Sequence, residues 1–193
     1  MITGADRGLG LALVQEYLKR GDRVFAGKYG KNWHLLEKLK ESFPDALSIV
    51  DLDVRNNESV AKAADFILAN TNAIDILINN AAVWKEQNTG TILEDKMDYE
   101  AMMEQFNVNA LGALRVTHAL IHAVLNSFDQ LVVNVSSEAG SMSECTKDTQ
   151  FGYCMSKAAL NMARGFIRIL DEPERFSAHM PGFVNYRGDK MNW

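Results

Sequence analysis

Thr3-Gly4-Ala5-Asp6-Arg7-Gly8-Leu9-Gly10 stands between a short apolar start, Met1-Ile2, and a stretch with helical spacing from Leu9 to Arg20. Its glycines are spaced GxxxGxG, which differs from the GxGxxG of the common dinucleotide fingerprint. The physical requirement is the same. One glycine permits a tight turn, another lets the backbone approach a pyrophosphate, and the amides that start a helix favour an anion. This segment therefore predicts a phosphate site at the first strand-to-helix junction, although a glycine triplet alone also fits an ordinary turn.

Apolar strand-like segments alternate with helical spacing along the rest of the chain. The predicted strands are Val24–Ala26, Leu47–Val54, Ile74–Ile78, Leu131–Val135 and Ser177–Met180. The further predicted helices are Trp33–Ser42, Val60–Leu68 with Asn57 as its cap, Tyr99–Leu125 and Phe151–Leu170. Near-continuous apolar strands separated by helices predict an α/β fold with a doubly wound (Rossmann-type) parallel sheet and helices on both faces, in three α/β/α layers.

Length and composition limit the possible classes of function. The 193 residues predict a single dinucleotide-binding and catalytic domain over 1–193. A net charge of −5 argues against a nucleic-acid partner. No apolar run approaches a membrane span and no secretory signal is visible, so we expect no membrane partner. Cys145 and Cys154 lack metal-ligand spacing, which favours a cytoplasmic protein with free thiols.

Two other features of the sequence are candidate sites. His118 and His122 have the i, i+4 spacing of two metal ligands on a helix, but no third ligand is evident, so no metal site is expected. Trp84 fits the wall of a substrate pocket and the anchor of a surface loop equally well.

The residues after the predicted strand Val24–Ala26 bear on the choice of cofactor. An NAD enzyme usually carries an acid near this point, where it binds the ribose 2′-hydroxyl. Here Gly27-Lys28-Tyr29 follows the strand, and Arg7 adds a second cation in the glycine turn. Two cations suit a 2′-phosphate, so NADP(H) is expected over NAD(H). The alternative is that either side chain points into solvent.

Tyr153 and Lys157 are four residues apart on a predicted helix and therefore share one of its faces. A nearby ammonium favours the phenolate that remains after proton donation, so it makes a phenol a better general acid. Taken alone, such a pair also fits a solvated helix face.

Several motifs in order along nearly the whole chain resemble the short-chain dehydrogenase/reductase family. They are Thr3–Gly10, Asp53-Val54, Asn79-Asn80-Ala81-Ala82, Asn109, Ser136-Ser137, Tyr153–Lys157 and Pro181-Gly182. Ser137 precedes Tyr153 by 16 positions, and this longer gap looks like the branch with C-factor-like proteins and sniffer-type carbonyl reductases. The resemblance implies an NADP-dependent oxidoreductase that reduces a small aldehyde or ketone. A dinucleotide-binding signalling or regulatory protein with little turnover is the alternative.

The resemblance also implies a role for each matched residue. Ser137 would hold the substrate carbonyl, Tyr153 would protonate it, Lys157 would make the phenol more acidic and bind the nicotinamide ribose, and Asn109 would hold a relay water. The implied cofactor-binding residues are Gly4, Asp6, Arg7, Gly8, Leu9, Gly10, Lys28, Asp53, Val54, Asn80, Ala81, Ala82, Tyr153, Lys157, Pro181, Gly182 and Val184.

The chain departs from the family pattern near its end. Relatives carry a substrate-covering loop and a helix where this chain passes directly from Val184 to Asn185. Either a mobile lid of a longer protein is omitted, which we favour, or the protein lacks the lid. The family's usual dimer faces correspond to Tyr99–Leu125 and Phe151–Leu170, so both a homodimer and a monomer stay open.

Overall fold

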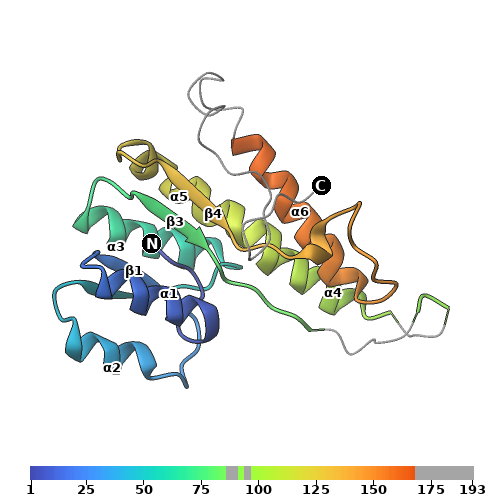
Figure 1. Ribbon diagram of the computed structural model, residues 1–193, viewed down its shortest axis with the longest axis horizontal. Helices are drawn as coiled ribbons and strands as arrows, with labels where there is room; N and C mark the ends of the chain where they lie inside the picture. The colour runs from blue at the N-terminus through green and yellow to red at the C-terminus, as the bar shows by residue number, and fades with distance from the viewer. Residues whose placement is uncertain (86–90, 94–96, 168–193) are drawn as a thin grey trace. The chain divides into compact units, whose positions relative to one another are not determined.

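The computed structural model describes residues 1–85, 91–93 and 97–167. The chain groups into two compact units (Figure 1). The first unit comprises Met1–Ala82 and Gly112–Val135, and the second comprises Val83–Leu111 and Ser136–Trp193.

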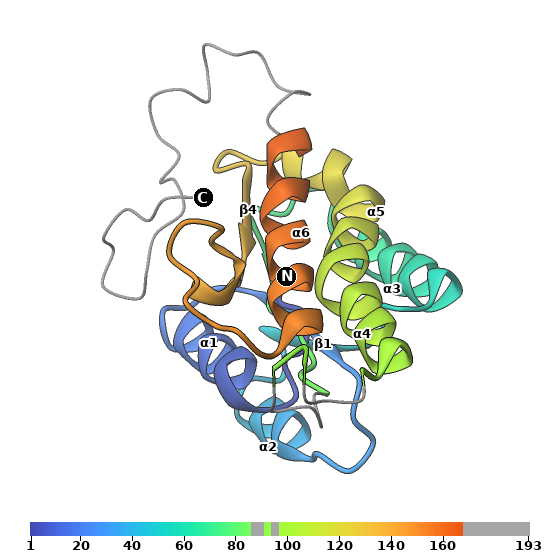
Figure 2. The same cartoon turned by 90° about the vertical axis from the view of Figure 1, so that its right-hand side faces the viewer.

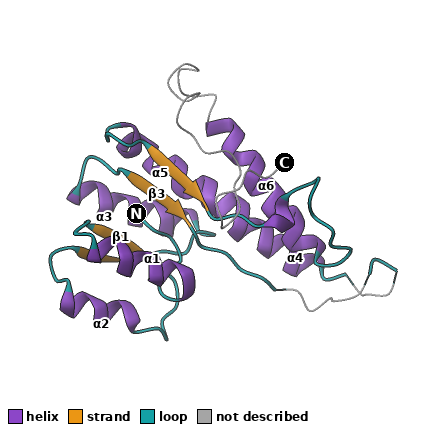
Figure 3. Cartoon of the chain, in the orientation of Figure 1, coloured by secondary structure: helices purple, strands orange, loops and turns teal. Residues whose placement is uncertain are grey.

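A parallel sheet forms the centre of the first unit (Figure 3). Strand β1 (Val24–Lys28) pairs with β2 (Leu47–Asp51), and β3 (Ile76–Asn79) pairs with β4 (Leu131–Asn134). Ile2 bridges Ala26 on one side and Ile78 on the other. The order is therefore β2-β1-Ile2-β3-β4. Because the chain moves outward from Ile2 in both directions, a topological switch point lies where the glycine turn begins.

Helices cover both faces of this sheet. Helices α3 (Asn57–Asn70) and α5 (Ala113–Leu125) lie side by side on one face, and α1 (Gly8–Lys19) lies on the other (Figure 2). Helix α2 (Leu35–Ser42) contacts α1. Val14 and Leu18 of α1 pack with strand residues in the buried core because they share one helix face. The predicted doubly wound α/β/α architecture is confirmed.

The second unit contains the helices that carry the predicted catalytic residues. Helix α4 (Tyr99–Phe106) packs against α6 (Phe151–Ile167), and Gly152 makes the contact close, since a Cβ there would lie 2.7 Å from Met102 Cγ. The short 3₁₀ helix η2 (Glu138–Gly140) also contacts α6. A π-helical turn, η1 (Asn107–Gly112), joins α4 to α5.

Several sequence expectations need correction. Asn57 does not cap α3, because the Oδ1 of Asn56 accepts the Ser59 amide at 3.0 Å. Tyr99–Leu125 is helical, but it contains the π turn. By length and composition this helix is also apolar enough to cross a membrane, which corrects the expectation that no apolar run approaches the length of a membrane span. Half of its most apolar 18-residue stretch is buried inside the protein. The core helix of a soluble protein meets the same criterion.

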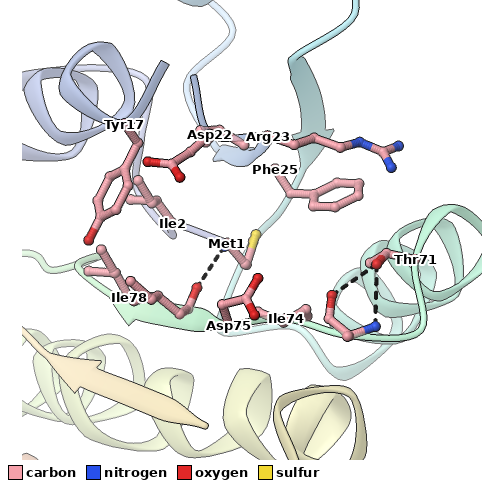
Figure 4. Close-up of a pocket in the computed structure, with 13 residues that line it drawn as sticks. Met1, Ile2, Tyr17, Asp22, Arg23, Phe25, Thr71, Ile74, Asp75 and Ile78 are labelled. Atoms are coloured by element: carbon pink, nitrogen blue, oxygen red, sulfur yellow. Dashed lines mark hydrogen bonds between the residues drawn. The ribbon is translucent and has the colours of Figure 1, made fainter. Parts of the chain in front are cut away.

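A cavity of about 200 Å³ lies at the amino ends of the strands in the first unit (Figure 4). Met1 and the residues that precede β1 and β3 line it, among them Asp22, Arg23 and Asp75. The terminal amine of Met1 donates to the Ile76 carbonyl at 2.8 Å. Ligands of open α/β sheets bind at the carboxyl ends of the strands, so this cavity lies at the edge opposite the glycine turn.

Candidate active site

The glycine turn has a backbone that only glycine accommodates without strain. Gly4 and Gly8 have φ angles of 60° and 54°, in the left-handed region. A Cβ on Gly4 would lie 2.8 Å from the Ala81 Cα, and one on Gly10 would lie 2.2 Å from the Gly4 carbonyl oxygen. By contrast, a Cβ on Gly8 would meet nothing within 4 Å. Two of the glycines therefore allow close backbone packing, whereas Gly8 borders open space.

Thr3 and Asn80 hold this turn against the end of β3. The Asn80 Nδ2 donates to the carbonyls of Thr3 and Gly4 at 2.9 and 3.0 Å. The Thr3 Oγ1 accepts the amides of Asn80 and Ala81, each at 3.0 Å. Asn80 and Ala81 were predicted at the cofactor site, whereas the role of the Thr3 side chain was missed. A threonine directly before the first glycine is the signal that could have revealed it.

The start of α1 suits a phosphate group. Its N-cap residue, Arg7, makes no side-chain capping bond, and the first turn contains no acidic residue. The first amides of a helix have no intrahelical partner, and the helix dipole adds a positive potential there. Together with the open space at Gly8, this arrangement fits the pyrophosphate of a dinucleotide.

The end of β1 differs from the sequence expectation in its charges. Glu37 of α2 forms an ion pair with Lys28, so the positive charge counted there is compensated. An acid is also present, although the sequence suggested none, because the Asp6 carboxylate accepts the Gly30 amide at 2.7 Å. Arg7 lies over the Trp33 ring, 5.5 Å from its centroid. Asp6 is among the predicted cofactor-binding residues, but the sequence did not show that its carboxylate, which belongs to the glycine turn, reaches the end of β1.

Asp53, one of the predicted cofactor-binding residues, follows β2 and binds Arg55 with both carboxylate oxygens. The Arg55 Nε lies 3.0 Å from Oδ1, and Nη2 lies 2.8 Å from Oδ2. These bonds hold the pKa of Asp53 below its usual range. Arg55 also donates to the Tyr29 hydroxyl at 2.5 Å, so it connects the ends of β1 and β2. Val54 is buried against Gly112.

In the second unit, Ser137 is the N-cap residue of η2, and Tyr153 and Lys157 lie on α6. The two helices η2 and α6 contact one another. The Ser137 Oγ accepts the Ala139 amide at 3.2 Å and caps η2. The Lys157 Nζ lies 5.8 Å from the centroid of the Tyr153 ring. Lys157 is only 2% exposed, and this burial lowers the pKa of its ammonium from 10.5 to about 8. The predicted placement of Tyr153 and Lys157 on one helix face is confirmed.

Burial of Lys157 predicts a pH dependence of stability. Below pH 8 the folded protein holds a charged, desolvated ammonium, which costs stability. Between pH 8 and 10.5 the unfolded chain binds this proton more tightly than the folded protein does. The free energy of unfolding is therefore expected to rise across this window by roughly 3 kcal/mol from this group. Urea unfolding of wild type and Lys157→Met at pH 7.5 and 10 measures the difference. Equal changes with pH in both proteins would contradict the expectation.

Asn109 lies in the π turn and is 1% exposed. Its Nδ2 donates to the Val83 carbonyl and to the Ser156 Oγ, both at 3.0 Å, and its Oδ1 accepts the Val83 amide at 2.8 Å. The Ser156 Oγ in turn donates to the Tyr153 carbonyl at 2.8 Å. The side chain of Asn109 thus ties the segment after Ala82 to the helix that carries Tyr153, whereas its role in holding a water stays a prediction.

Asn161 adds a second tie within the catalytic unit, which the sequence did not reveal. Its Oδ1 accepts the Ser136 hydroxyl at 2.5 Å, and its Nδ2 donates to the Gly140 carbonyl at 3.0 Å. A Cβ on Gly140 would lie 2.7 Å from the Lys157 carbonyl carbon, so the loop after β4 approaches α6 closely. These contacts position the residues on either side of Ser137 relative to α6.

The remaining expectations have separate outcomes. The predicted cofactor residues between Gly4 and Ala82 all belong to the first unit, and the four predicted catalytic residues all belong to the second. Pro181, Gly182, Val184, the strand Ser177–Met180 and the proposed gap after Val184 lie outside the described residues. Trp84 is 62% exposed. Among the described residues, no group of three or more metal-ligating side chains occurs.

Comparison with known proteins decides the family. The family described as short chain dehydrogenase matches residues 1–185. The chain belongs to this family. An uncharacterised oxidoreductase of Schizosaccharomyces pombe is 30% identical to this short-chain dehydrogenase over 187 residues, which cover 95% of the chain and 72% of the relative. The C-signal protein of Myxococcus xanthus is 37% identical over 122 residues, which cover 58% of the chain and 71% of the relative.

Solved structures support the same assignment. The Sniffer carbonyl reductase of D. melanogaster has a TM-score of 0.78 at 25% identity, covering 90% of this chain and 75% of that one. An NADPH-bound carbonyl reductase from chicken fatty liver has a TM-score of 0.72 at 30% identity, covering 83% and 69%. The expected resemblance to the C-factor-like and sniffer-type branch is confirmed. These relatives support an NAD(P)-dependent oxidoreductase of the short-chain dehydrogenase type.

Proposed function

We propose that this short-chain dehydrogenase reduces the carbonyl group of a small aldehyde or ketone with NADPH. The observation that carries the proposal is the buried Lys157 ammonium, 5.8 Å from the ring of Tyr153 on the same helix. A desolvated cation beside a phenol favours the phenolate, so it eases donation of the phenolic proton.

The residues of the second unit divide the remaining work. A bound nicotinamide dinucleotide supplies the hydride. Ser137 accepts the Ala139 amide and keeps its own hydroxyl hydrogen for the substrate oxygen. Tyr153 gives that oxygen a proton as negative charge develops on it. Asn109, through Ser156, fixes the backbone of Tyr153. The protein therefore contributes position and electrostatics to a reaction whose redox chemistry belongs to the cofactor.

The preference for NADP(H) draws on two kinds of support. The chicken carbonyl reductase was solved with NADPH. An NADP-dependent 3-hydroxy acid dehydrogenase of Escherichia coli is 30% identical over 143 residues, covering 73% of this chain and 54% of that relative. Within this chain, Arg7 stands at the start of α1 with its guanidinium over Trp33, where it suits a 2′-phosphate. Asp6 is the opposing charge, since a carboxylate repels that phosphate.

Cofactor titration followed by a carbonyl panel tests the function. Protein fluorescence measures NADPH and NADH binding, and NADPH oxidation is followed with aldehydes, ketones and quinones. We expect tighter binding of NADPH and turnover of at least one substrate class. Tighter NADH binding would overturn the cofactor preference. NADPH binding without turnover of any carbonyl would instead favour a regulatory dinucleotide-binding protein, an alternative suggested by the likeness to the C-signal protein.

A further inference from the structure

The two cysteines of the chain lie next to each other in the second unit. The Sγ atoms of Cys145 and Cys154 are 3.9 Å apart, and neither cysteine is in a disulfide. Cys145 lies in the loop after η2, and Cys154 lies in the first turn of α6, directly after Tyr153. The Cys145 thiol points at the Cys154 sulfur, whose own thiol points at the Thr149 carbonyl. Both side chains are partly exposed, so a small oxidant has access to them.

We propose that Cys145 and Cys154 are a redox-modification site that a hydroperoxide converts into an intramolecular disulfide. The backbone at each cysteine is held in place, because the Cys145 amide donates to the Ser141 carbonyl at 3.1 Å and the Cys154 amide donates to the Gln150 carbonyl at 3.0 Å. A disulfide requires sulfur atoms about 2.05 Å apart. The sulfurs must therefore approach by about 1.9 Å for the bond to form.

The chemistry balances with a hydroperoxide as the oxidant. One thiolate attacks the peroxide, the O–O bond breaks, and a sulfenic acid forms as an alcohol or water leaves. The second thiol then attacks the sulfenic sulfur, the S–S bond forms, and the S–O bond breaks with loss of water. Two thiols lose two electrons and two protons, and the peroxide is reduced. With the partner sulfur 3.9 Å away, this second step competes well with further oxidation of the sulfenic acid.

The bridge would restrain the segment between Ser137 and Tyr153. It closes a loop of nine sequence positions and attaches that loop to the first turn of α6. A loop of this length loses conformational freedom mainly in the unfolded chain, so the oxidised protein is expected to melt about 5 °C higher than the reduced one. This inference is independent of the proposed carbonyl reductase activity.

The test treats the full-length reduced protein with hydrogen peroxide and measures intact mass and peptide links. We expect a mass loss of about 2 Da, a Cys145–Cys154 cross-link, and reversal by dithiothreitol. Cys145→Ser and Cys154→Ser leave one thiol each, so they should gain oxygen or form dimers linked between chains. Any of three results for the wild type would overturn the proposal. The protein could gain oxygen without a cross-link, it could form only intermolecular disulfides, or it could keep both thiols under conditions in which the single variants react.

Discussion

Tyr153→Phe is expected to lower kcat for carbonyl reduction by about 10²- to 10⁴-fold, the usual contribution of a positioned general acid. The substitution removes the only proton that the ring can donate and keeps the ring that faces the Lys157 ammonium at 5.8 Å. NADPH binding should stay close to that of wild type. Initial rates at saturating NADPH and carbonyl, with a fluorescence titration of NADPH, measure the two effects separately.

Tyr99→Phe is the matched control for this experiment. Tyr99 begins α4 in the same unit, but its side chain is 68% exposed, and no catalytic role is assigned to it. The same loss of a hydroxyl there should leave kcat unchanged. Wild-type turnover in Tyr153→Phe would remove Tyr153 from the mechanism. Equal losses in both variants would show that the effect is not specific to the proposed acid.

Asn109→Ala is expected to give the largest loss of stability, about 3–5 kcal/mol in the free energy of unfolding. The substitution leaves the partly buried Val83 amide and carbonyl without their bonds to this side chain, and it also removes the buried bond to the Ser156 Oγ. Unmet polar groups that are cut off from water carry the full cost of desolvation. Urea unfolding at fixed pH measures this loss.

Asn126→Ala supplies the comparison, because the side chain of Asn126 donates an exposed bond from its Nδ2 to the Asn72 carbonyl at 3.2 Å. Its removal should change stability by less than about 1 kcal/mol. Ser156→Ala should fall between the two, since it removes one bond to Asn109 and one to Tyr153. If Asn109→Ala were as stable as Asn126→Ala, the network around Val83 would not be holding the second unit together.

The sheet and the glycine turn could be predicted because their signals are local. Apolar runs marked the strands, and the GxxxGxG spacing marked the backbone that Gly4 and Gly8 adopt at positive φ. The helical spacing of Tyr153 and Lys157 likewise placed them on one face of α6. The cap of α3 could not be predicted in this way. Asn56 and Asn57 have the same side chain, and the sequence does not show which of the two lies just outside the helix.

The supporting contacts could not be predicted because they join residues that are distant in sequence. Asn109 and Ser156 are 47 positions apart, and Ser136 and Asn161 are 25 apart. A single sequence contains no signal that pairs them. The charges at the end of β1 were misjudged for the same reason. Glu37 from α2 and Asp6 from the glycine turn reach this region only after the chain folds.

The contact between Gly4 and Ala81 limits how this protein can change during evolution. Because a Cβ at position 4 would lie 2.8 Å from the Ala81 Cα and 3.2 Å from its Cβ, neither position can accept a larger side chain while the other keeps its place. Thr3 strengthens the dependence, since one hydroxyl bonds the amides of both Asn80 and Ala81. Substitutions in the glycine turn and in the Asn80-Ala81 segment are therefore expected to be tolerated only in combination. At each position, the residue opposite limits which amino acids can be accepted.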